Sequence, residues 1–86
     1  MDTYYVCVDI PATGSRIKEL AMQRGITPED FRRCLGLGCV QTIYKWYKGQ
    51  AIPSIDNLIM IAHMLDVKLD DLIVIMDPGS EWEKHA

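Results

Sequence analysis

Long hydrophobic runs are absent from this 86-residue sequence. No stretch approaches the roughly 18 apolar residues that a membrane-spanning helix needs. The first ten residues contain Asp2 and Asp9 but no lysine or arginine, so the positively charged start of a signal peptide is missing as well. These absences predict a protein of the bacterial-type cytoplasm that has no membrane partner.

Cysteines are few and irregularly spaced. Cys7, Cys34 and Cys39 form no C-x-x-C pair, and free thiols are their expected state in a reducing compartment. A metal site built from Cys34, Cys39 and His63 is the alternative, but this spacing matches no zinc pattern. We therefore expect no metal and no other cofactor.

Side-chain combinations typical of catalysis are missing too. Asp70, Asp71 and His63 are the only candidates, and no Ser/His/Asp set or phosphate-binding glycine loop accompanies them. The two aspartates are better explained as the start of a helix, where negative charge is favourable. The sequence argues against an enzyme and gives no sign of a small-molecule ligand.

Charge is unevenly distributed along the chain, although the net charge is only −3. Residues 14–49 hold seven basic and three acidic residues, a net charge of +4, whereas residues 50–86 hold two basic and seven acidic residues, a net charge of −5. The basic segment favours contact with nucleic acid on one side of the molecule. A chance division in a short chain explains the counts equally well.

Turn and capping residues divide the chain into a short strand and five helices. The strand covers residues 3–10 and ends at Pro11. The helices run from Thr13 or Gly14 to Gly25, over residues 28–35, 39–48 and 55–65, and from near Leu69, after which residues 72–76 finish as a second strand. We expect an N-terminal arm (1–13), a helical domain (14–76) and a mobile tail (77–86). The predicted core consists of Leu20, Phe31, Leu35, Ile43, Trp46, Leu58, Ile61 and Leu65.

Residues 28–48 contain the ingredients of a helix-turn-helix. Thr27 is a predicted N-cap, with Pro28 at the first helical position and Asp30 at the third. The turn Gly36-Leu37-Gly38 then leads into the third helix, which Gly49 ends.

Short motifs in a specific order extend this pattern over about two thirds of the chain. They are RIKEL (16–20), GIT (25–27), LGL (35–37), IYKW (43–46), Gly49, PSIDNL (53–58), LDV (65–67) and DDL (70–72). Together they resemble the Cro-like phage-repressor family, often labelled XRE, in a variant common in clostridial bacteria. The resemblance implies an all-α, five-helix, lambda-repressor-like domain. The strands expected from the N- and C-terminal residues would add a small two-stranded β element to it.

The resemblance also implies which residues face double-stranded DNA. The N-terminal part of the third helix would enter the major groove, where Gln41 suits adenine, Lys45 guanine or phosphate, and Val40 a thymine methyl group. The implied set is completed by Cys39, Tyr44 and three residues that would hold phosphates, Lys48, Arg16 and Thr27. A merely solvated helix face is the alternative for Gln41 and Lys45.

The sequence departs from the family at three places, two of which reduce the expected contacts with the DNA backbone. The family usually has Gln at the position of Pro28, and proline has no N–H to donate. Ala21 and Tyr47 stand where the family often has an Arg–Glu ion pair, so packing replaces that pair. The loop 50–52 lacks the basic residues that often hold phosphates, which predicts weaker and less salt-dependent binding.

The implied function is sequence-specific transcriptional regulation by a repressor. A protein-interaction module on the same fold, such as an antitoxin or an antirepressor, is the alternative, favoured by the acidic C-terminal half and the missing phosphate contacts. Helix 55–65 is apolar on more than one side, since Met60, Met64 and Ile59 lie outside its core stripe. Either a homodimer that uses the terminal strands and the fourth or fifth helix covers this surface, or the strands close over it within a monomer.

Overall fold

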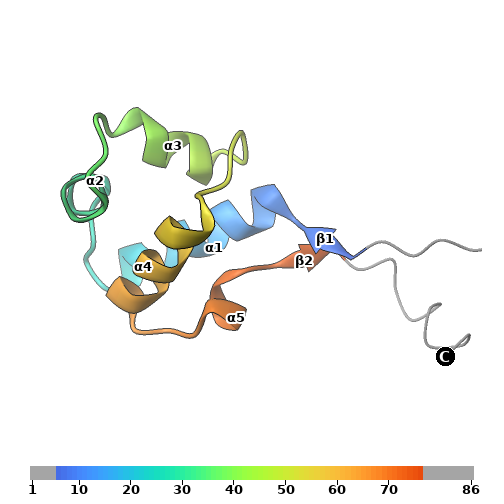
Figure 1. Cartoon of the computed structure of the whole chain (residues 1–86). Coiled ribbons are helices and arrows are strands. Elements are labelled where there is room, and N and C mark those ends of the chain that lie inside the picture. Colours follow the sequence, from blue (N-terminus) through green and yellow to red (C-terminus); the bar gives the residue numbers. More distant parts are fainter. Residues whose placement is uncertain (1–5, 77–86) are drawn as a thin grey trace, which may run out of the picture.

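The computed structural model describes residues 6–76 as five helices and a two-stranded antiparallel sheet (Figure 1). In chain order the elements are β1 (Cys7–Val8), α1 (Ile10–Gln23), α2 (Pro28–Leu35), α3 (Gln41–Tyr47), α4 (Ile55–Leu65), α5 (Leu69–Leu72) and β2 (Ile75–Met76). The predicted five-helix fold with its small β element is confirmed. The predicted tail, 77–86, lies outside the described residues. Within residues 6–76, none of the helices has the length and apolar character that crossing a membrane requires.

Helix α1 begins at Ile10, earlier than the predicted start at residue 13 or 14. The Asp9 carboxylate accepts a hydrogen bond from the Ala12 N–H (3.0 Å), so Asp9 is the N-cap, and Pro11 occupies the first turn. Proline suits this place because its fixed φ fits a helix and the first N–H groups have no helical partner. The strand prediction for residues 3–10 was therefore wrong at its C-terminal end, since β1 ends at Val8.

Helix α2 has the predicted bounds and the predicted cap. The Thr27 hydroxyl accepts the Asp30 N–H (3.1 Å), and the Asp30 carboxylate accepts the Thr27 N–H (2.9 Å), which completes a capping box. Gly36 ends the helix in the left-handed region (φ 68°), which glycine adopts at little cost. The Arg32 guanidinium donates to the Leu37 carbonyl (3.3 Å) and so braces the turn that leads to α3.

Helix α3 is shorter than the predicted range 39–48, because it begins after Val40 and ends before Lys48. It packs closely on α1. A Cβ placed on Gly14 of α1 would lie only 1.8 Å from the Trp46 carbonyl oxygen. The missing side chain at residue 14 therefore allows the two helices to approach, and the depth at which α3 sits on the domain depends on it.

Helices α4 and α5 begin where the sequence predicts. Ser54 caps α4 by accepting the Asn57 N–H (3.2 Å), and Asp66 ends it in the left-handed region (φ 54°). Helix α5 is a single turn with Asp70 and Asp71 at its start. The aspartates therefore have the structural place that the sequence assigned to them.

The pairing of the two short strands brings the two ends of the described chain together. The strands pair antiparallel, with Val8 opposite Ile75, which confirms the predicted two-stranded element. The second strand is shorter than the predicted range 72–76, because Leu72 still belongs to α5.

Thr13 anchors the segment before β2 to α1. Its buried hydroxyl donates to the Val74 carbonyl (3.2 Å) and accepts the Val74 N–H (3.0 Å). One side chain thus satisfies both backbone groups of Val74, a long-range contact that sequence reasoning missed.

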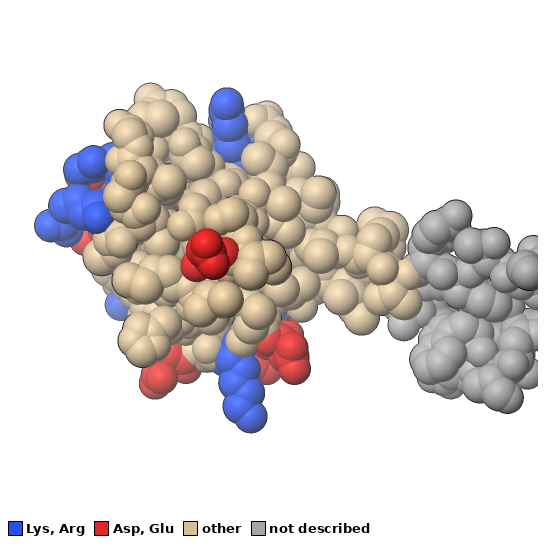
Figure 2. Space-filling view, viewed as in Figure 1, with Lys and Arg blue, Asp and Glu red and all other residues tan. Residues whose placement is uncertain are grey.

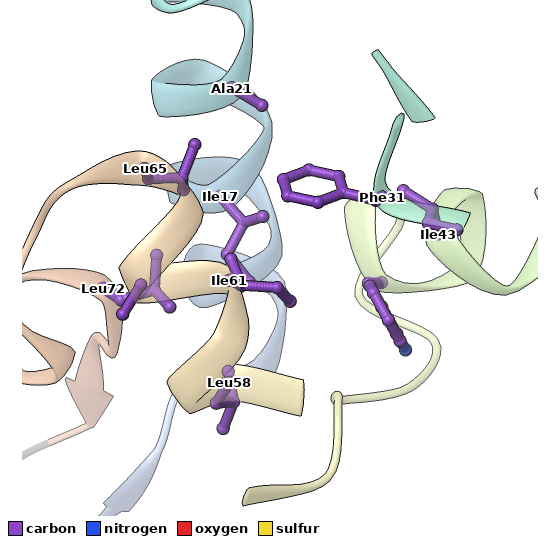
Figure 3. Close-up of a cluster of buried hydrophobic side chains, with 10 residues drawn as sticks. Ile17, Ala21, Phe31, Ile43, Leu58, Ile61, Leu65 and Leu72 are labelled. Atoms are coloured by element: carbon purple, nitrogen blue, oxygen red, sulfur yellow. The ribbon is translucent and has the colours of Figure 1, made fainter. Parts of the chain in front are cut away.

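The core lies where the helices meet (Figure 3). Its buried hydrophobic residues are Ile17, Ala21, Phe31, Ile43, Trp46, Leu58, Ile61, Ala62, Leu65 and Leu72. Figure 3 shows the Phe31 ring reaching from α2 toward α1. Six of the eight predicted core residues belong to this set, whereas Leu20 and Leu35 are only half-buried at its edge.

The outer surface of α4 remains uncovered in the described chain. Ile55 and Ile59 are 63% and 53% exposed, and both residues of β2 are more than half exposed. The paired strands extend away from the helices (Figure 1). Figure 2 shows mainly uncharged residues over α4, with one acidic side chain near the middle. The strands therefore pair without closing over α4, so the monomer explanation for this apolar surface is wrong for residues 6–76.

Candidate nucleic-acid interface

The outer side of α3 carries an open groove of about 260 Å³. Gln41, Tyr44, Lys45 and Lys48 line it together with Gln50 from the following loop. All five side chains are exposed. Four of the eight predicted DNA-facing residues thus lie on one surface. Its amides and ammonium groups are of the kinds that hydrogen-bond to base edges and to phosphates.

The inner side of α3 explains why these residues face outward. Ile43 and Trp46 are three residues apart and buried against the core. Residues at i, i+4 and i+7 share a helix face, which places Gln41, Lys45 and Lys48 together on the opposite side. The packing of two apolar side chains therefore fixes the orientation of the polar ones.

Cys39 and Val40 precede α3 in the turn. The Cys39 sulfur lies 3.7 Å from the Thr42 hydroxyl oxygen. Hydrogen bonding to the Thr42 side chain, and then to the Thr42 and Gln41 backbone, lowers the pKa of this exposed thiol, with a smaller contribution from the charge of Lys45. Val40 is half-buried and caps the helix without a side-chain hydrogen bond. Both residues border the groove-bearing face without lining the groove.

The start of α2 offers little to a phosphate. The Asp30 carboxylate already accepts the Thr27 N–H. The hydrogen bond from the Thr27 backbone, with those from the Thr27 and Arg33 side chains, lowers the pKa of Asp30, so this group is negatively charged at neutral pH. A carboxylate thus occupies the place where the helix would attract an anion. Pro28 has no N–H to offer beside it.

Arg16 lies on a different side of the domain from the groove. Its Nε donates to the Asp71 carbonyl in α5, and α5 lies across α1 from α3 (Figure 1). The structure therefore does not bring Arg16 together with the predicted residues of α3.

Lys18 is the α1 cation that approaches α3, and sequence reasoning missed it. It lines a second pocket with Tyr44, Tyr47 and Lys48. The available signal was its spacing from Gly14, because residues four apart share a helix face and Gly14 contacts α3. That signal requires knowing why Gly14 is a glycine, which the sequence alone does not reveal.

The cations of α2 are balanced by acids on the same helix. Arg32 pairs with Glu29, and Arg33 pairs with Asp30 at 2.7 Å. In Figure 2 the blue atoms at the left, over α2, lie beside red ones. Such exposed pairs add little stability, but they reduce the positive field around α2. The cations that line the two pockets of α3 are Lys18, Lys45 and Lys48.

Comparison with known families decides the general nature of this surface. Residues 16–78 match the Cro/C1-type HTH DNA-binding domain. The chain belongs to this family. The matched range contains α2, the turn and α3, so the predicted resemblance is confirmed, while the narrower clostridial-type variant stays a prediction. This family is one of DNA-binding domains. No curated protein sequence matches the chain.

Solved structures of regulators share the fold of this Cro/C1-type domain. The restriction-modification controller protein C.AhdI from Aeromonas hydrophila is 26% identical, with a TM-score of 0.66 over 74% of this chain and 96% of that one. The clp gene regulator ClgR from Corynebacterium glutamicum is 16% identical, with a TM-score of 0.66 over 72% of this chain and 65% of that one. A transcriptional regulator from Listeria innocua is also 16% identical, with a TM-score of 0.66 over 85% of this chain and 68% of that one. Family and fold together identify the chain as a DNA-binding regulator.

Proposed function

We propose that this protein is a sequence-specific repressor that acts in the cytoplasm and places α3 in the major groove of double-stranded DNA. The observation that carries the proposal is the groove on α3, where Gln41, Tyr44, Lys45 and Lys48 lie together on an exposed surface. A B-DNA major groove is about 12 Å wide and admits an α-helix. Repression is the simplest output for so small a domain, because occupied DNA excludes other proteins.

Each of these four groove residues has a role that follows from its chemistry. Gln41 pairs with the N6 and N7 atoms of adenine, and Lys45 with O6 and N7 of guanine or with a phosphate. Lys48 neutralises a phosphate, and Tyr44 provides apolar contact beside it. Cys39 and Val40 approach the DNA from the turn before α3.

Two of the predicted phosphate contacts have weaker support. Thr27 is exposed, but the neighbouring Asp30 carboxylate repels a phosphate. Arg16 would have to release the Asp71 carbonyl before it could bind DNA. We therefore propose that Lys48 is the main phosphate contact and that Thr27 and Arg16 contribute less.

Selection from a random duplex library, followed by anisotropy titration at low salt, tests this function. The selected duplex should bind at least tenfold more tightly than a shuffled duplex of the same composition. Equal affinity for the two would contradict sequence-specific reading. No binding to either at low salt would favour the protein-interaction module instead.

We also propose that the protein acts as a homodimer. The support is the exposed apolar surface of α4, where Ile55, Ile59 and Met60 lie outside the core. The residues of β2, Ile75 and Met76, are exposed as well. Contiguous apolar surface of this kind is typical of an interface. A two-fold dimer would also suit DNA, because it reads two half-sites about one helical turn apart.

Sedimentation equilibrium at micromolar concentration tests the dimer. The wild type should show twice the single-chain mass of 9.8 kDa, and Ile59→Lys should shift it to the single-chain mass. Gln23→Lys, which adds the same charge at an exposed position at the end of α1, should remain dimeric. A wild-type protein with the single-chain mass at every concentration would rule the dimer out.

A further inference from the structure

A second pocket opens between α1, the start of α2 and α3. Its volume is about 250 Å³, and Met22, Ile26 and Pro28 contribute apolar lining. Tyr44 and Tyr47 add two aromatic rings that meet edge to face, with centroids 6.3 Å apart. Mostly apolar walls with a few polar groups are typical of small-molecule sites.

The charged side chains that line this pocket are both basic. Lys18 and Lys48 are its charged lining residues, and both are exposed. Burial, and then the neighbouring Tyr44, raises the pKa of Tyr47 to about 12, so its hydroxyl stays a neutral hydrogen-bond donor at physiological pH. An apolar pocket flanked by two ammonium groups is complementary to a ligand with an apolar body and an anionic end.

We propose that this pocket binds a small amphipathic anion, namely an aromatic carboxylate of one or two rings, and that the bound anion weakens DNA binding. The volume lies below the roughly 300–1,000 Å³ of sites for drug-sized ligands. A ligand of one or two rings therefore fits better than a peptide segment. A DNA phosphate could bind the lysines, but it has no apolar part to fill the space between Met22, Ile26 and Pro28.

The link to DNA follows from residues that the two pockets share. Tyr44 and Lys48 line both this pocket and the α3 groove. A carboxylate bound to Lys48 neutralises a cation that DNA would otherwise use, and DNA affinity falls when a phosphate has no cationic partner. This regulatory part rests on the proposed DNA binding, whereas the binding of the anion does not.

Isothermal titration calorimetry of the full chain with 2-naphthoate, in the absence of DNA, tests the site directly. We expect one ligand per chain. The uncharged analogue 2-naphthamide, which has the same rings, should bind at least tenfold more weakly. No heat of binding at millimolar 2-naphthoate, or equal affinity for the amide, would overturn the proposal.

Two matched variants locate the bound ligand. Met22→Glu adds a negative charge to the pocket at a side chain that is 70% exposed, so the fold should tolerate it, and it should weaken 2-naphthoate binding at least tenfold. Met60→Glu makes the same change on the exposed surface of α4 and should leave binding unchanged. The opposite result would place the ligand on α4 and overturn the site. Far-UV circular dichroism verifies that both variants are folded.

A separate titration tests the effect on DNA. Saturating 2-naphthoate should raise the Kd for the selected duplex at least about fivefold, the lower end of typical coupling between two sites. The same concentration of 2-naphthamide should not. An unchanged Kd would overturn the regulatory part. Binding of 2-naphthoate by a protein that binds no DNA would refute the proposed function and support the anion site.

Discussion

Replacing Gly14 by alanine sets helix propensity against packing. Gly14 lies inside α1, where alanine is favoured over glycine by about 0.8–1.0 kcal/mol. The structure opposes this gain, because the new Cβ would lie 1.8 Å from the Trp46 carbonyl oxygen and 2.9 Å from its carbonyl carbon. Reaching even a tight 3.0 Å contact with that oxygen requires a shift of about 1.2 Å. The obstructing atoms are backbone, so no side-chain rotation relieves the contact.

The magnitudes decide the sign of the effect. Overpacking costs about 1–3 kcal/mol, and a clash with backbone belongs at the upper end. After the propensity gain is subtracted, we expect Gly14→Ala to lower the free energy of unfolding by about 2 kcal/mol. For a domain of this size that corresponds to a fall in Tm of roughly 8–16 °C.

Thermal and urea unfolding followed by circular dichroism measures this change. Gly38→Ala is the matched control, because a Cβ there would meet nothing within 4 Å and Gly38 does not have a positive φ. The control should unfold within about 0.5 kcal/mol of the wild type. A Gly14→Ala protein as stable as the wild type, or more stable, would refute the close contact between α1 and α3.

Four further predictions concern individual side chains. Trp46→Ala should destabilise the domain by about 3–5 kcal/mol, measured by urea unfolding, because this side chain is buried beneath α3. Thr13→Val should cost about 1–3 kcal/mol in the same assay, because it leaves the Val74 N–H without its partner, whereas Thr13→Ser should retain most of that stability. Thr27→Ala should cost about 1 kcal/mol through loss of the α2 cap. Hydrogen bonds lower the pKa of Asp30. The stabilisation by its carboxylate should therefore be present above about pH 4 and be lost as the pH falls through its folded pKa. Asp30→Asn should remove this part of the acid dependence of the free energy of unfolding, measured by urea unfolding at several pH values.

Local signals predicted much of the fold. The bounds of α2 and α4 were right because Thr27, Asp30 and Ser54 cap helices through bonds to residues only three positions away. Pro11 misled because proline both ends strands and begins helices, and the choice depends on Asp9 accepting the Ala12 N–H. Local chemistry can thus allow two structures, and one hydrogen bond selects between them.

Long-range contacts account for what the sequence could not predict. Gly14 was interpreted as a helix start, but its role depends on Trp46, 32 positions later. In the same way, the structural role of Thr13 depends on its hydrogen bond to the distant Val74. The side chain of Arg16 donates a hydrogen bond to a carbonyl of α5, a contact that the sequence does not indicate. The residues of α3 were easier to place, because their shared face follows from helical spacing alone. The neighbouring Lys18 could be recognised only after α1 and α3 were packed together.

The central claim is that Gln41 on α3 reads a base in the major groove. The most direct measurement compares the Kd of wild type and Gln41→Ala for the selected duplex and for the shuffled one. Gln23→Ala removes the same exposed side chain from the end of α1 and serves as the control. We predict that Gln41→Ala loses about 1–3 kcal/mol on the selected duplex alone, roughly a five- to 150-fold rise in Kd, while Gln23→Ala loses neither affinity nor specificity. Equal losses on both duplexes, or no loss on either, would contradict base reading by α3.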